Sequence, residues 1–219
     1  MERRLITVPF GPLQSNMYLI TGDAGIFVVD PSVSPQRTEE FSGISGLANG
    51  GAEVRAVLLT HGHHDHIKYV SEWQEAYPGA EFFFSSNDSE LIGNGYMNCS
   101  YMEGQQIKYD FKYTDIAGMN GDPVFSDKDI TVKVLETPGH TMGSVCFLFD
   151  IDGEKNLFTG DTVFRGSVGR TDMPGGSSRD IMESVRRISK LDPHLDIFPG
   201  HGPGSTIGDE IKYNPFFET

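Results

Sequence analysis

A cluster of histidines lies directly behind a short apolar run in this sequence. Four of the seven histidines fall within 61-HGHHDH-66, which follows the apolar segment 54-VRAVLLT-60. An apolar run of this length with polar residues behind it is typical of a buried strand. Three explanations of the cluster compete: a metal site, a solvated polar loop and an incidental histidine-rich tract. Residues elsewhere in the chain are needed to choose among them.

The spacing within the cluster favours a metal site. In an extended segment alternate residues point to the same side, so His61 and His63 can reach one ion. Asp65 and His66 then project from the turn into a following helix, toward a neighbouring point. Imidazole nitrogen and carboxylate oxygen are ligands that Zn, Fe(II) and Mn accept. A helix N-cap is the alternative role for Asp65, but the whole H-x-H-x-D-H pattern predicts metal ligands.

Three further candidate ligands lie later in the chain, each among small residues. His140 lies in the turn TPGHTMGS between two predicted strands, whereas Asp161 in LFTGDTVF and His201 in FPGHGP each follow an apolar strand. Strand ends on a rigid sheet can present such side chains to a shared cleft. The two remaining histidines are interpreted as structural, because His64 points away from its neighbours and His194 lies in a predicted loop.

Strands and helices are predicted to interleave along the chain. Apolar runs predict strands at 4–10, 17–22, 25–30, 54–60, 80–85, 130–136, 144–150, 156–160 and 195–199. Helical patterns predict helices within 36–48, 67–77 and 178–191, the last capped by Ser177 or Ser178. Segment 86–128 lacks periodicity and is interpreted either as a flap over the cleft or as satellite core. No linker interrupts the chain, so we expect a single domain over residues 1–219.

Composition limits the partners and the compartment. The chain carries 17 basic and 31 acidic residues, a formal net charge of −14, and this field disfavours nucleic acid. No apolar run is long enough to cross a bilayer. Cys99 and Cys146 do not suggest a disulfide framework, and Cys146 is interpreted as a buried strand residue. Pro9 interrupts the short apolar stretch of the N-terminus, which makes a poor secretory signal. We expect a cytoplasmic protein without a membrane partner, of open oligomeric state.

Together, the motifs resemble those of the metallo-β-lactamase superfamily. H-x-H-x-D-H, a later G-H-T, a G-D-T after a strand and a final P-G-H-G occur in order, and they are most similar to short, one-domain glyoxalase II-like (hydroxyacylglutathione hydrolase-like) enzymes. The similarity runs from 14-QSN-16 through 166-GSVGRTDMPGG-176 to 213-YNPF-216. It implies an α/β fold, namely a four-layer αββα sandwich of two mixed β-sheets flanked by helices, with a two-metal centre at one edge.

The resemblance also implies two sets of ligands and a pair of divalent cations. Carried over by position, the ligands of the first metal are His61, His63 and His140. Those of the second metal are Asp65, His66 and His201, and Asp161 bridges the two metals. Zn is the expected metal, with Fe and Mn as alternatives.

A thioesterase mechanism follows from such a centre. Two divalent cations can share a water molecule and lower its pKa from about 15.7 to about 7, which would supply a metal-bridging hydroxide as nucleophile. The sequence contains neither G-x-S-x-G nor H-E-x-x-H. A thioester suits hydroxide attack, because a thiolate leaves without a strong general acid. We therefore predict a glyoxalase II-type hydrolase of S-lactoylglutathione or a similar acyl thioester, with Asp65 as proton acceptor.

Recognition of a glutathione conjugate would depend on the 166–176 loop. Arg170 occupies the position of a basic residue that contacts the glutathione moiety in glyoxalase II enzymes, although a surface ion pair with Asp172 is the alternative. Asp172 also replaces the aromatic residue of those enzymes. The longer enzymes carry a C-terminal helical domain with further glutathione contacts, and we expect none here.

Other functions of the same fold stay open. Persulfide dioxygenases resemble this chain in a G-R-T-D loop like 169-GRTD-172, and they hold one Fe(II) with two histidines and an aspartate. Against that reading, 199-PGHGP-203 is more similar to the hydrolases. Another ester or lactone hydrolase and a non-enzymatic metal-binding protein are further alternatives. The complete set of ligand positions argues against the last of these.

Overall fold

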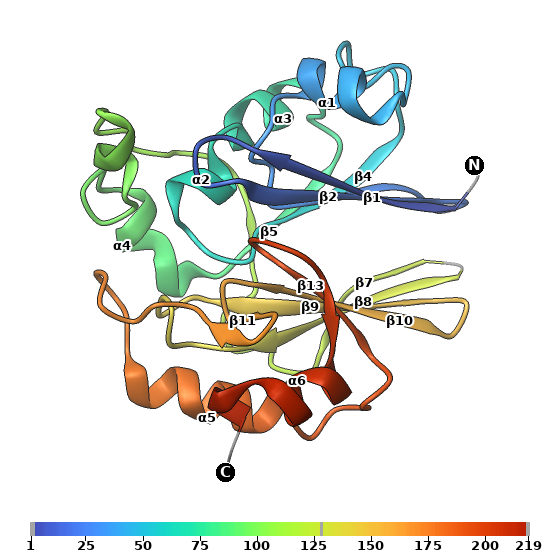
Figure 1. Cartoon of the computed structure of the whole chain (residues 1–219). Helices are drawn as coiled ribbons and strands as arrows, with labels where there is room; N and C mark the ends of the chain where they lie inside the picture. Colours follow the sequence, from blue (N-terminus) through green and yellow to red (C-terminus); the bar gives the residue numbers. More distant parts are fainter. Residues whose placement is uncertain (1–2, 128, 218–219) are drawn as a thin grey trace.

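Two six-stranded β-sheets pack face to face in the computed structural model, which describes residues 3–127 and 129–217, and helices cover both outer faces (Figure 1). The first sheet has the order β1-β2-β3-β4-β5-β6 and the second the order β14-β13-β10-β9-β8-β7. Both sheets are mixed, since β3 pairs parallel to β4 and β10 pairs parallel to β13 beside antiparallel neighbours. This architecture confirms the predicted αββα sandwich.

The first sheet and its helices come from the N-terminal half. Its strands are β1 (Arg4–Phe10), β2 (Ser15–Gly22), β3 (Gly25–Val29), β4 (Val54–Leu58), β5 (Glu81–Phe84) and β6 (Thr114–Asp115). The helices of this half are α1 (Pro35–Ser42), α2 (His64–Ile67), α3 (Val70–Ala76) and α4 (Ser89–Ile92), with 3₁₀ turns η1 (Ser86–Asp88) and η2 (Ser100–Glu103).

The second sheet and its helices follow. Its strands are β7 (Pro123–Asp127), β8 (Ile130–Glu136), β9 (Val145–Ile151), β10 (Glu154–Gly160), β13 (Asp196–Pro199) and β14 (Ser205–Thr206). A small hairpin consists of β11 (Val163–Phe164) and β12 (Ser167–Val168), and the remaining elements are α5 (Ser178–Ile188), α6 (Ile207–Tyr213) and the 3₁₀ turn η3 (Pro215–Phe217).

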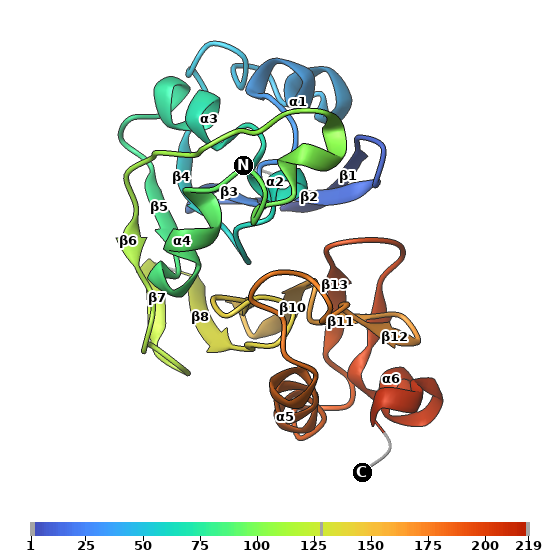
Figure 2. The same cartoon turned by 90° about the vertical axis from the view of Figure 1, so that its left-hand side faces the viewer.

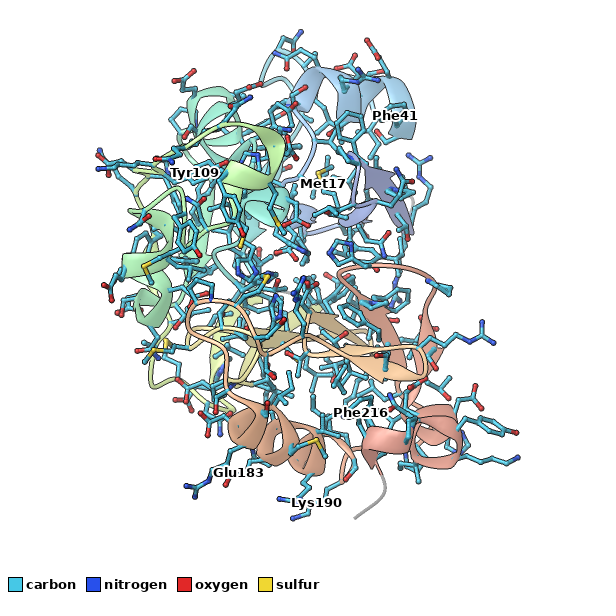
Figure 3. All side chains as sticks on the ribbon, turned by 60° about the vertical axis from the view of Figure 1, so that its left-hand side comes forward. Met17, Phe41, Tyr109, Glu183, Lys190 and Phe216 are labelled. Carbon is cyan, nitrogen blue, oxygen red and sulfur yellow. The ribbon has the colours of Figure 1, made fainter. Side chains whose placement is uncertain are left out.

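Alternation along the strands produces the four layers (Figure 2). In β2, Met17 and Leu19 belong to the outer cluster that contains Trp73 of α3, whereas Tyr18 and Ile20 belong to the cluster between the sheets. A strand with both faces buried needs apolar residues at every position, which explains its continuous apolar run. Figure 3 shows Glu183 of α5 pointing away from the sheets, on the opposite side of that helix from the core.

All nine predicted strands are present, but two helices differ from the prediction. The helix expected within 36–48 ends at Ser42, because Gly43 takes a left-handed φ of 68° and its N–H caps the last turn. The helix expected over 67–77 begins earlier and is interrupted at Tyr69, whose N–H donates to Pro31 O (3.1 Å) instead of continuing a helix. Ser177 caps α5, as predicted, and accepts a hydrogen bond from Asp180 N (3.2 Å). Helix α6 was not predicted from the sequence.

Segment 86–128 contributes to both apolar cores of the first sheet. Ile92 and Tyr109 pack in its outer core, and Ile116 packs between the sheets. The His64 side chain contacts the Tyr109 hydroxyl, and His64 N donates to Asn98 O (2.8 Å). Tyr109 lies in the half of the molecule that holds Met17 (Figure 3). These contacts agree with the satellite-core interpretation and with a structural role for His64, while a flap function stays a prediction.

Two other features bear on the expectations from composition. Cys146 is buried on β9, as predicted. Among the described residues, no helix is both long and apolar enough to cross a bilayer. The cytoplasmic location and the single domain over 1–219 stay predictions, and residues 1–2, 128 and 218–219 lie outside the described part.

Candidate metal centre

The candidate centre lies where strand ends from both sheets meet. The first sheet supplies the loop after β4 and the start of α2, which faces the second sheet in Figure 2. The second sheet supplies His140 from the β8–β9 turn, Asp161 after β10 and His201 after β13. Strands β10 and β13 are parallel neighbours, so their carboxyl ends lie at the same edge. The backbone bridge between Ser15 and His201 joins the two sheets beside this edge.

Folding brings all seven predicted ligands together. The ligand atoms of His61, His63 and His140 lie within 4.8 Å of one another, as do those of Asp65, His66 and His201. Asp161 lies between the two groups. Its Oδ1 is 3.3 Å from His66 Nε2, and its Oδ2 is 3.4 Å from His140 Nε2 and 3.5 Å from His201 Nε2. The arrangement matches two sites with a shared carboxylate, and the ligand roles themselves stay predictions.

Four of these imidazoles have one ring nitrogen held by the protein and the other turned toward the centre. The held Nδ1 atoms and their partners are His61 with Thr60 Oγ1 (3.0 Å), His66 with Asp30 Oδ2 (2.9 Å), His140 with Arg170 O (2.8 Å) and His201 with Leu13 O (3.0 Å). A hydrogen bond that fixes Nδ1–H leaves the lone pair on Nε2, which is the pattern of metal-bound histidine.

Unpaired polar atoms show that the centre fits a cation. His61 Nε2 and Asp161 Oδ1 are buried and have no hydrogen-bond partner. His63 turns its Nδ1 toward the first ligand group, 2.9 Å from His140 Nε2. An unsatisfied buried polar atom costs about 1–3 kcal/mol, and a cation bound here would compensate that cost. Divalent cations accept imidazole nitrogen and carboxylate oxygen. The residues present therefore fit the metals that the sequence motifs imply.

Asp30 and Thr60 support the centre, and their roles were not predicted from the sequence. Asp30 follows β3, and its carboxylate accepts hydrogen bonds from Thr60 N (2.8 Å), Thr60 Oγ1 (2.7 Å) and His66 Nδ1. Since the Thr60 hydroxyl donates to Asp30, its oxygen accepts from His61 Nδ1. One carboxylate thus orients a histidine of each ligand group. Its position at a strand end is the only sequence signal for this role.

A glycine explains part of the P-G-H-G motif. A Cβ atom at Gly200 would lie 2.2 Å from Asp161 Oδ1 and 2.7 Å from His66 Cε1. Any side chain at this position would therefore displace the shared carboxylate.

Asp30→Asn is expected to weaken metal binding about 10- to 100-fold, the usual loss when the partner of a ligating histidine is removed. Asparagine keeps the shape and tolerates the left-handed φ of 52° at this position, but it offers one fewer acceptor. Competition with a chromophoric chelator measures the affinity. Asp127→Asn, which changes an aspartate paired with Arg55, is the control. Equal affinities in the two variants would contradict this role of Asp30.

The centre is electrostatically polarised. Burial and the neighbouring His140 lower the pKa of His63 to about 3. Burial opposes a charge on His66 and on His201, but the Asp161 and Asp65 carboxylates outweigh it and raise these pKa values to about 9 and about 11. Burial likewise disfavours ionised Asp161, yet the imidazoles, His66 foremost, lower its pKa to about 2. Asp161 and Asp65, whose pKa is also lowered by the imidazoles, are therefore ionised at neutral pH. Protons compete with cations for the nearby Nε2 atoms.

Arg170 forms the surface ion pair that was its alternative role. Its Nε donates to Asp172 Oδ1 (2.7 Å) and its second guanidinium nitrogen donates to Oδ2 (2.8 Å). Its side chain is 57% exposed, so the pair lies in water. The backbone oxygen of Arg170, rather than its side chain, contacts the centre through His140. A substrate contact by the guanidinium stays a prediction.

Comparisons with known proteins agree with this geometry. The sequence matches the Metallo-beta-lactamase superfamily over residues 10–201. It is 32% identical to a probable metallo-hydrolase of Streptococcus pyogenes, over 92% of this chain and 85% of that protein. The structure superimposes on the B3 metallo-beta-lactamase BLEG-1 with a TM-score of 0.84, at 28% identity over 99% of this chain and 100% of the other. It superimposes on TTHA1623 in a di-iron-bound form with a TM-score of 0.79, at 32% identity over 96% and 99% of the two chains.

Proposed function

Because the chain belongs to the metallo-beta-lactamase superfamily, we propose that it is a metal-dependent hydrolase of acyl thioesters, of the glyoxalase II type. The observation that carries the proposal is the meeting of two three-residue ligand groups around Asp161, with buried ligand atoms that have no other partner. His61, His63 and His140 would hold one cation, and Asp65, His66 and His201 the other. A bound pair of divalent cations supplies Lewis acidity and a water molecule of lowered pKa.

Exposure of the ligands defines the side from which a substrate approaches. His61, His63 and His140 of the first ligand group are almost fully buried. The side chains of Asp65 and His201 are 15% and 26% exposed. A substrate carbonyl therefore meets the centre from the side of Asp65 and His201, and the first ligand group forms the closed floor.

Asp65 has the surroundings of a carboxylate that stays charged. Burial disfavours its charge, but His66, His201 and the Ser15 hydroxyl, which donates to Oδ2 (2.7 Å), together hold the pKa of Asp65 well below its usual range. An ionised carboxylate at the open side can bind a cation and can take a proton from a reacting water. The role of Asp65 as proton acceptor belongs to this proposal.

A thioester is the substrate class that requires the least acid catalysis from these side chains. A thiolate leaves without protonation, so the centre needs no strong acid beside the leaving group. S-lactoylglutathione is the first compound to test, and Zn is the first metal, with Fe and Mn beside it. Because Arg170 is engaged by Asp172, glutathione recognition by its guanidinium requires that this exposed pair opens.

The test combines metal analysis with two assays on the same preparation. We expect two metal ions per chain and release of free thiol from S-lactoylglutathione. Oxygen uptake with glutathione persulfide and one iron per chain would instead indicate a persulfide dioxygenase. Arg170→Ala should raise KM for the glutathione thioester and leave kcat unchanged if the guanidinium binds the thiol moiety. Lys190→Ala, which removes a cation on the far side of α5, is the control (Figure 3).

A further inference from the structure

Asp88 is a buried carboxylate next to the centre that belongs to neither ligand group. It follows β5 in the turn η1, and its residue exposure is 1%. Its Oδ2 accepts hydrogen bonds from Gly62 N (2.9 Å) and from Thr141 Oγ1 (2.7 Å), and its Oδ1 accepts one from Gly143 N (2.7 Å). Burial of a carboxylate is costly unless it is hydrogen-bonded, and here three donors compensate.

The three donors come from the two turns that carry the first ligand group. Gly62 lies between His61 and His63, on the side of the first sheet. Thr141 and Gly143 follow His140, in the β8–β9 turn of the second sheet. The sheets have different cores on their outer faces, so the distance between the two turns is not set by either sheet alone. The Asp88 carboxylate binds both turns at once.

Close packing adds to the hydrogen bonds. A Cβ atom at Gly143 would lie 2.6 Å from Asp88 Cγ, and a Cβ atom at Gly62 would lie 2.9 Å from Ile92 Cγ2 and 3.4 Å from Asp88 Cβ. The turn at Gly143 therefore approaches Asp88 so closely that only glycine fits there, whereas a side chain at Gly62 would press on Ile92. Hydrogen bonds from a backbone N–H to a carboxylate are short and stronger than those between neutral groups, so they hold both turns against Asp88.

We propose that Asp88 is a positioning residue that sets the separation between the His61–His63 pair and His140, and thereby the affinity of the first metal position. Among the groups of candidate ligands that the described residues form, only the first takes histidines from both of these turns. Loss of Asp88 therefore acts mainly on the first metal position. The inference rests on the proposed metal centre and is independent of the thioester substrate.

Asp88→Asn tests the inference with little change in shape. An amide offers one oxygen and one NH₂ group, so in either orientation the N–H of Gly62 or of Gly143 faces another donor. We expect the first metal position to bind about 10- to 100-fold more weakly, the range found when outer partners of metal ligands are removed. Stepwise titration with Co(II), followed by its visible absorption bands, measures the two positions separately.

Glu210→Gln is the matched control for a lost buried carboxylate. Glu210 is also buried (2% exposed) and accepts hydrogen bonds from Gly166 N and Asn214 Nδ2 (both 2.8 Å), away from the ligand-bearing turns. We expect it to lower the melting temperature without changing either Co(II) affinity. This control separates positioning from general stability.

Thr141→Val is a milder second variant that removes one of the three hydrogen bonds. It should weaken the same metal position in the same direction by a smaller factor, which keeps the test valid if Asp88→Asn does not fold. Unchanged Co(II) binding in a folded variant, or an equal loss at both positions, would overturn the inference. Because the titration uses no substrate, it can be interpreted even if the protein does not hydrolyse thioesters.

Discussion

Asp161→Ala is expected to lower kcat/KM for the true substrate about a thousand-fold and to reduce the bound metal from two ions to one. Asp161 contacts His66, His140 and His201, so its carboxylate lies directly between histidines of both ligand groups. One cation contributes several kcal/mol of transition-state stabilisation, and about 1.4 kcal/mol corresponds to a tenfold rate. Loss of roughly 4 kcal/mol therefore gives a factor of about a thousand.

Metal analysis and steady-state kinetics check this expectation together. Asp150→Ala is the control, because Asp150 lies on β9 and pairs with Lys155 away from the centre. Full turnover with two bound ions would refute the bridging role.

Divalent cations are expected to stabilise the fold strongly, and more so at higher pH. A ligand at a thousand times its Kd adds about 4 kcal/mol to the free energy of unfolding. For a chain of this size each kcal/mol raises Tm by about 2–4 °C, so a saturating metal should raise it by roughly 8–16 °C. Thermal unfolding with and without added Zn measures the difference.

The pH dependence follows from His66 and His201. Without cations their pKa values are raised from 6.5 to about 9 and about 11, so protonation stabilises the folded chain fully below pH 6.5 and the effect fades as pH rises through those values. Cations need the same nitrogens deprotonated, so their affinity rises with pH over that window. The metal-dependent rise in Tm should therefore be larger at pH 8.5 than at pH 6.5.

Histidine variants test the origin of that dependence. His201→Ala should reduce both the rise in Tm and its pH dependence, because it removes a ligand and a competing proton site. His194→Ala, at an exposed loop position, should behave like the unchanged chain. A metal-dependent rise that is the same at both pH values would contradict the proton competition.

The elements that sequence patterns predicted well are those whose burial is continuous. Strands such as β2 and β9 are apolar on both faces, so they stand out against any neighbouring loop. Helix ends were predicted less well, because they depend on single backbone conformations such as the left-handed φ at Gly43 and on the Tyr69 N–H bond to Pro31. Segment 86–128 shows no helical or strand periodicity of apolar residues, because its buried residues are divided between two cores.

The candidate ligands were found from the sequence because each lies at a strand end with a recognisable spacing. The residues that orient them were not, because Asp30, Thr60 and Asp88 act through partners that are distant in the chain. His66 reaches Asp30 across 36 positions, and Thr141 reaches Asp88 across 53. An aspartate after a strand has many ordinary roles, so nothing local distinguishes these from capping or turn residues.

The amino-acid sequence was enough to predict interleaved strands and helices and the chemical identity of the candidate donors, because strand periodicity and the histidine and aspartate spacings are local properties. The αββα layering was implied by the family resemblance. Folding was needed to show which imidazole nitrogens face the centre, how the two ligand groups meet, and that Arg170 pairs with Asp172. The reason is that these properties depend on hydrogen bonds between segments that meet only after folding, such as the bond from His201 to Leu13, which spans 188 positions of the chain.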